Sequence, residues 1–130
     1  MGRILIIFSL LALLAAVTVA CGGNSSSAGP QEVSVSLTEF KVDSSVTSFT
    51  VGKEYRFVIT DKGNVPHEWM IMPRGVADHM MALEEVEEDE LPVGAKVTKF
   101  FTFTKAGDYE FACHLPGHYE AGMVQHITVQ

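Results

Sequence analysis

Three side chains near the C-terminus, Cys113, His118 and Met123, are of types that together bind a soft metal ion. They are evenly spaced, with four residues between each pair. The turn residues Pro116-Gly117 allow the loop to bring them to one point. Thioether sulfur is a weak, soft ligand that structural zinc sites do not use, whereas sulfur combined with imidazole favours copper. The spacing therefore predicts a copper site on this loop.

A fourth ligand must come from another part of the chain. His67 stands at the start of a predicted strand and is well placed for this role. The other histidines outside the loop, His79 and His126, have no partnered spacing, so we interpret them as surface or strand residues. A less favoured alternative is that Met80 and Met81 join His79 in a second, weaker Cu(I) site.

Short β-type runs must position these ligands. Val33, Val35 and Leu37 alternate with polar residues, which is typical of a strand with one face in solvent. Turn residues separate most of the later runs. About seven short strands without βαβ spacing predict an all-β fold, an antiparallel Greek-key β-sandwich. The predicted runs are 33–37, 47–51, 55–60, 68–72, 97–104, 108–112 and 125–129.

The stretch 76–90 breaks this pattern and predicts a short helical or irregular insert. Its second half, 84–90, holds six acids in seven residues. A solvated loop is the plainest interpretation. A docking patch for a positively charged redox partner is the second. Metal capture by the acids is the third, and it is weak because carboxylates without matched geometry hold metals poorly.

Residues 1–20 have the layout of a secretory signal peptide, with a positive start at Arg3, a long apolar run and a small residue before Cys21. A cysteine in this place resembles a lipoprotein signal, in which Cys21 is lipidated. Thr18 departs from the aliphatic residue usual there. An uncleaved anchor and a released protein are the alternatives. Residues 21–31 then form a flexible tether, and the domain spans 32–130 outside the membrane.

The net charge indicates which partners suit the protein, and the cysteine content indicates whether a disulfide can form. A net charge of −7 argues against nucleic acid, whose phosphates repel an acidic surface, and suits a cationic partner. If Cys21 carries lipid, Cys113 is the only remaining thiol. An exported domain stabilised by a disulfide needs two. A lone thiol exposed to oxidation requires burial or a metal to protect it.

Together, Asn64-Val65-Pro66-His67-Glu68 and the later Cys113-x4-His118-x4-Met123 resemble the type 1 copper site of the cupredoxins, the plastocyanin and azurin family. The resemblance covers most of the chain from Val33 to Val129. It implies one copper ion, cycling between Cu(I) and Cu(II). The implied ligands are His67, Cys113 and His118 in a plane, with Met123 as a long axial contact. It also implies a strand-corner role for Tyr109.

Two positions depart from the usual cupredoxin pattern. Many members have Asn after the first histidine and Ser or Thr after the cysteine, and these residues lock the two ligand strands together. Here Glu68 and His114 occupy those places. We hypothesise that a contact between Glu68 and His114 replaces the usual link between the two ligand strands. Strand alternation predicts that the His114 side chain points away from the metal.

The resemblance implies an electron-transfer protein rather than an enzyme. A closed ligand set leaves no coordination position for a substrate, and Gly117 stands where a binuclear copper centre needs a second cysteine. Expected partners are redox proteins such as membrane oxidoreductases or cytochromes, met by a monomer through His118 and the apolar Leu115, Pro116 and Pro66. The alternatives are an exported module for copper delivery or buffering, and a redox-inert structural domain.

Overall fold

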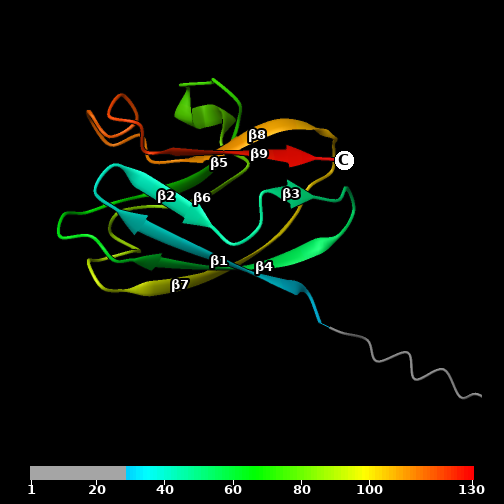
Figure 1. Ribbon diagram of the computed structural model, residues 1–130, viewed down its shortest axis with the longest axis horizontal. Coiled ribbons are helices and arrows are strands. Elements are labelled where there is room, and N and C mark those ends of the chain that lie inside the picture. The colour runs from blue at the N-terminus through cyan, green and yellow to red at the C-terminus, as the bar shows by residue number, and fades with distance from the viewer. Residues whose placement is uncertain (1–28) are drawn as a thin grey trace, which may run out of the picture.

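Two packed β-sheets make up residues 29–130, the part of the chain that the computed structural model describes (Figure 1). One sheet has the strand order β2-β1-β4-β7 and the other has the order β3-β9-β8-β5-β6. The predicted all-β sandwich is therefore confirmed. Its elements are β1 (Gln31–Thr38), β2 (Lys41–Ser44), β3 (Ser48–Phe49), β4 (Glu54–Asp61), β5 (Trp69–Pro73), the 3-10 helix η1 (His79–Met81), β6 (Glu84–Val86), β7 (Lys96–Thr102), β8 (Gly107–Ala112) and β9 (Val124–Val129).

The predictions for the N-terminal segment concern residues that the structure does not describe. The signal peptide 1–20, the lipidation site Cys21 and the tether as far as residue 28 lie outside the described residues. Within residues 29–130, no helix has the length and apolar character needed to cross a bilayer.

Strand direction differs from the predicted antiparallel sandwich of about seven strands. β1 runs parallel to β4 and β3 runs parallel to β9, so both sheets are mixed, and residues 29–130 contain nine strands. Parallel neighbours need a crossover between them. Residues 39–53 provide it, with β2 in the first sheet and β3 in the second. Alternation along one strand specifies its buried face but not the direction of its neighbour.

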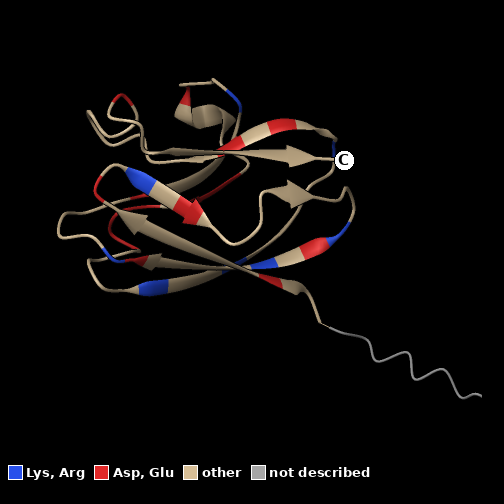
Figure 2. Ribbon diagram, viewed as in Figure 1, with Lys and Arg blue, Asp and Glu red and all other residues tan. Residues whose placement is uncertain are grey.

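The predicted helical or irregular insert is only partly right. Residues 79–81 form the one-turn helix η1, but residues 84–86 form the edge strand β6 on β5. Val86 lies opposite Trp69 and is fully buried. The acids around it gather on this edge and on the turn after it (Figure 2). Charged residues on an edge strand discourage pairing with another chain, which makes an acidic edge physically reasonable.

The core is built from the inward faces of both sheets. In β4, Tyr55, Phe57, Ile59 and Asp61 alternate with partly exposed residues, and all four are buried. The ring of Phe57 packs on Trp69 at a centroid distance of 5.3 Å. Three of the four inward positions therefore carry apolar side chains whose burial drives folding. The fourth is a carboxylate, which needs a partner.

Tyr109 makes the strand-corner contact that the cupredoxin resemblance implies. Its hydroxyl donates a hydrogen bond to the carbonyl oxygen of Lys105, at 3.1 Å, across the turn that leads into β8. We expect Tyr109→Phe to lower the free energy of unfolding by about 1 kcal/mol, because one intramolecular hydrogen bond is lost. Urea unfolding of both proteins measures this difference. An unchanged midpoint would contradict a stabilising role for the hydroxyl.

The segments that carry the predicted ligands meet at one end of the sandwich. The connection from β4 to β5 contains His67, and the loop from β8 to β9 spans residues 113–123. The turn between β1 and β2 lies at the same end, at the left in Figure 1. These three connections bring residues that are distant in the sequence to the same end of the sandwich.

Candidate metal centre

The β8–β9 hairpin brings Cys113 and Met123 opposite each other. Ala112 pairs with Val124, so the next residue on each strand forms the next rung. The N–H of Cys113 donates to the carbonyl oxygen of Met123 at 3.2 Å. The N–H of Met123 in turn donates to the carbonyl oxygen of His118 at 3.0 Å. The backbone of the loop therefore gathers the three loop residues that the spacing selects.

The side chains of Cys113 and His118 are close enough to share a metal ion. Cys113 Sγ lies 3.3 Å from His118 Nδ1. Two ligands bound to one ion at about 2.3 Å for sulfur and about 2.0 Å for nitrogen, at a tetrahedral angle, lie roughly 3.5 Å apart. The observed distance matches this value. Cys113 is fully buried, and His118 is partly exposed.

His67 reaches the same region from the connection between β4 and β5. Its ring centroid lies 5.3 Å from that of His118. Two imidazoles on one ion, with bonds of about 2.0 Å, have ring centres roughly 5–6 Å apart. The Nδ1 atom of His67 lies 3.0 Å from Asp61 Oδ1, while its Nε2 atom is buried without a hydrogen-bond partner. A buried, unpaired imidazole nitrogen is costly unless a ligand satisfies it.

The donor set fits a soft metal ion, although it is not closed in its present arrangement. Within residues 29–130, no three His, Cys, Asp or Glu side chains stand close enough together to hold a metal. Among the four predicted ligands, only His67, Cys113 and His118 are of these residue types. The His67 ring is hydrogen-bonded to Asp61. Met123 supplies the remaining donor and is fully buried. Ligation by His67, Cys113, His118 and Met123 stays a prediction that the fold accommodates.

Asp61, the last residue of β4, contacts the predicted ligand His67 and is not among the site residues predicted from the sequence. Its carboxylate is fully buried and accepts the N–H of Gly63 at 2.8 Å besides contacting His67. Gly63 lies directly against the His67 ring, where a β-carbon would collide with it. A usable signal was present: the alternation of β4 places Asp61 on the buried face, and a buried carboxylate requires a partner.

The hypothesised contact between Glu68 and His114 exists, but it runs to the backbone. Met70 lies opposite Ala112, so Glu68 lies opposite His114 two residues further along. Glu68 Oε1 accepts the N–H of His114 at 2.7 Å. Glu68 is almost fully buried. This bond ties the segment that leads from His67 into β5 to the segment that follows β8 and carries Cys113, as the hypothesis requires.

Loss of the Glu68 carboxylate should loosen this connection. We expect Glu68→Ala to lower the free energy of unfolding by about 1–3 kcal/mol, because the buried N–H of His114 loses its acceptor. Glu68→Gln keeps an acceptor oxygen and should recover most of the loss. Denaturant unfolding of the metal-free proteins gives both values. Equal stability of the Ala variant and the parent would show that the bond contributes nothing.

Burial is the main influence on the pKa of Cys113, the predicted thiolate ligand. Desolvation raises the pKa of the Cys113 thiol, and hydrogen bonds from the backbone of Glu68 and Leu115 oppose this shift. The thiol is therefore protonated in the metal-free protein at neutral pH. A metal ion must displace that proton, because the thiolate is the ligand.

The exposed edge of the centre is formed by His118 and a residue that the sequence analysis missed. Phe40, in the turn between β1 and β2, meets the His118 ring edge-on at 5.5 Å. Its backbone φ is +59°, an uncommon conformation for a bulky residue. Phe40 and Val65 are both exposed, as are Pro66 and Pro116, whereas Leu115 is half-buried. Position 40 carries no pattern that would have identified it.

A network of polar side chains is centred on Glu110, three residues before Cys113. Glu110 is fully buried in β8 and accepts the hydroxyl of Tyr119 at 2.8 Å. His126 Nδ1 lies 3.4 Å from the other Glu110 oxygen. The Tyr119 ring stacks on the His114 ring at a centroid distance of 4.6 Å, so the two side chains pack against each other within the loop 113–123. Burial and the bond to Glu110 raise the pKa of Tyr119, and burial lowers the pKa of His114.

Comparison with solved structures supports the fold. An auracyanin from Roseiflexus castenholzii aligns with a TM-score of 0.63 and 21% identity, covering 78% of this chain and 99% of that one. Auracyanin A, a "blue" copper protein from Chloroflexus aurantiacus, gives 0.61 and 22% over 78% and 100%. Rusticyanin from Thiobacillus ferrooxidans gives 0.61 and 16% over 78% and 79%. At these identities the likeness concerns the fold alone.

Similarity in sequence points to copper. A copper-resistant cuproprotein CopI from Rubrivivax gelatinosus is 34% identical over 88 residues, covering 61% of this chain and 53% of that protein. A CopI from Pseudomonas aeruginosa is 67% identical over 30 residues, 23% and 17% of the two chains. The chain thus spans about half or less of the curated relatives that it matches. The family of copper binding proteins, plastocyanin/azurin family, matches residues 25–130, so the chain belongs to this copper-binding cupredoxin family.

Proposed function

We propose that this chain holds one copper ion through His67, Cys113, His118 and Met123 and passes single electrons to and from partner proteins. The observation that carries the proposal is the burial of the donors. His67, Cys113 and Met123 are fully buried, and only His118 is partly exposed. An electron can leave such a site through the His118 edge, whereas the ion itself cannot leave without opening the loop.

Copper supplies the one-electron redox step between Cu(I) and Cu(II), and the protein supplies fixed donors. The hairpin register holds Cys113 and Met123, and Asp61 holds His67. Such supporting contacts orient ligands and tune the metal. A donor set that moves little between the two oxidation states favours fast transfer. Four protein donors on one copper ion would leave no coordination position for a substrate, so we propose no catalytic role.

We further propose that the domain works outside the membrane as a monomer, anchored by lipid on Cys21. Its partners would be membrane oxidoreductases or cytochromes that contact the Phe40 and His118 end. The acidic segment 84–90 suits a cationic partner, although Glu84 and Glu90 each lie within 4 Å of Lys99, at 3.6 and 3.7 Å. Cys21→Ser should move the protein from the membrane fraction to the soluble fraction. Unchanged membrane association would contradict lipidation.

Copper handling is the second candidate. It is favoured by the name of the relatives, which describes copper-resistant cuproproteins. A protein with this role would bind copper to deliver or buffer it rather than to cycle it.

One purified sample separates the two candidates. We expect the copper(II) protein to show an intense visible absorption that a mild reductant bleaches and an oxidised cytochrome restores. The copper content should stay at one ion per chain through repeated cycles. A colourless protein that binds only Cu(I) and passes it to an acceptor chelator would overturn electron transfer and favour copper handling.

A further inference from the structure

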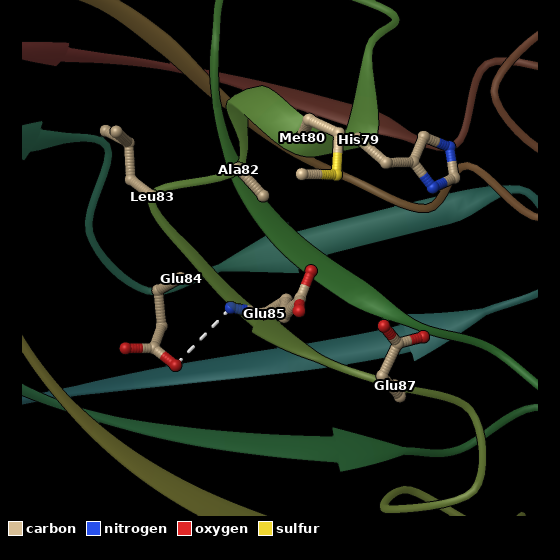
Figure 3. A pocket seen from close by; sticks show the side chains of 7 residues that line it. All are labelled: His79, Met80, Ala82, Leu83, Glu84, Glu85 and Glu87. Atoms are coloured by element: carbon tan, nitrogen blue, oxygen red, sulfur yellow. Dashed lines mark hydrogen bonds between the residues drawn. The ribbon is translucent and has the colours of Figure 1, made fainter.

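The one-turn helix η1 places a histidine and a methionine on the surface beside the ligand loop. His79 and Met80 leave η1 from adjacent positions and line a cavity of about 480 Å³ together with Glu85 and Glu87. Figure 3 shows the His79 ring pointing away from Met80, so the flexible Met80 side chain must turn for its thioether to meet the ring. Met80 is 89% exposed. An apolar side chain exposed to this extent gains nothing from the core, but its thioether is available to bind a soft ion.

His114 faces this helix from the ligand loop. Its ring lies 5.1 Å from that of His79, centroid to centroid. This separation is close to the 5.3 Å between His67 and His118, the two imidazoles of the main centre. It also falls in the range of roughly 5–6 Å expected when two imidazoles share one ion. The two rings need no large movement to reach a common ligand.

The Nε2 atom of His114 lacks a hydrogen-bond partner. This atom is also inaccessible to solvent. The ring cannot easily turn to satisfy it, because one face stacks on Tyr119 at an interplanar angle of 13°. Tyr119 is in turn held by its bond to the buried Glu110. A fixed imidazole with an unpaired, buried nitrogen is a site prepared for a donor or a metal ion.

We infer that His79, Met80 and His114 form a second copper site that takes Cu(I) at the protein surface. Two imidazoles and a thioether are a soft donor set, which selects Cu(I) over the hard cations that carboxylates bind. The nearby Glu85 and Glu87 attract cations to this surface. The site shares no ligand with Cys113, His118, Met123 and His67, so it goes beyond the proposed function and does not depend on it.

Silver(I), a redox-inert substitute for Cu(I), tests the second site. The main centre is first filled with Cu(I), and Ag(I) is then added while the methionine methyl and histidine ring NMR signals are followed. We expect the Met80, His79 and His114 signals to shift together and to saturate at one equivalent. The Met123 and His67 signals should stay unchanged, and the visible absorption should return in full on oxidation.

Matched variants assign the ligands. His79→Ala and Met80→Leu should each weaken Ag(I) binding by about tenfold or more, which corresponds to about 1.4 kcal/mol. His126→Ala and Met81→Leu should leave it unchanged, because His126 contacts Glu110 instead and Met81 does not line the cavity. Saturation without any shift at Met80, or full affinity in the His79→Ala protein, would overturn the inference. Either result leaves the test of the main centre intact.

Discussion

We expect Cys113→Ala to abolish the intense visible absorption of the copper(II) protein, because the substitution removes the thiolate ligand that the hairpin presents. Its sulfur lies 3.3 Å from His118 Nδ1, and no other cysteine is found within residues 29–130. Two imidazoles and a thioether remain in the variant, and these give only a weakly coloured copper(II) site. Absorption spectra of the two proteins at equal copper loading measure the change.

A second substitution separates loss of the ligand from loss of the fold. Met123→Leu should keep a coloured site with a shifted reduction potential, since the axial ligand tunes the potential without forming the strong bond. Met72→Leu is the matched control, because Met72 is equally buried but lies away from the ligand loop, in β5. A volume-conserving swap of this kind costs less than about 1.5 kcal/mol. A coloured copper form retained by Cys113→Ala would remove Cys113 from the centre.

Most of the sandwich could be predicted because its strands carry strong local patterns. The alternation in β1 and β4 gives each strand one buried face, and residues 96–102 and 107–112 are bounded by turn residues. Two short strands, β2 and β6, were not predicted from the sequence. In β2 and β6 only a single residue is buried, Val42 and Val86 respectively, and one buried residue cannot show a period of two. Their identity as strands comes from pairing with β1 and β5.

The candidate centre was predictable where it lies within one continuous loop. Spacing alone selected Cys113, His118 and Met123, and the hairpin register explains why that spacing works. The supporting residues depend on contacts between segments distant in sequence. Phe40 reaches His118 from another sheet, and Glu68 reaches the backbone of His114, which no side-chain pattern can reveal. Pairing across the fold, rather than composition, places these residues.

The largest effect outside the ligands themselves should come from Asp61. Its buried carboxylate contacts His67 Nδ1 at 3.0 Å and leaves the other ring nitrogen free. A carboxylate in this position fixes the tautomer and orientation of a ligand imidazole and raises its basicity. We therefore expect Asp61→Ala to weaken copper binding by about 10–100-fold, the usual cost of losing such a supporting group.

Asp61→Asn distinguishes the contribution of charge from that of position. Asparagine keeps an oxygen that can accept from His67 and from the N–H of Gly63, but it lacks the negative charge. We expect it to hold the ring in place, so copper affinity should fall less than in Asp61→Ala. The reduction potential should rise in both variants, because a buried negative charge next to a ligand stabilises Cu(II) over Cu(I). Competition with a copper chelator and a redox titration measure the two quantities. Unchanged affinity in Asp61→Ala would mean that His67 turns away from Asp61 when it binds copper, and that the orphaned Nε2 is not the donor.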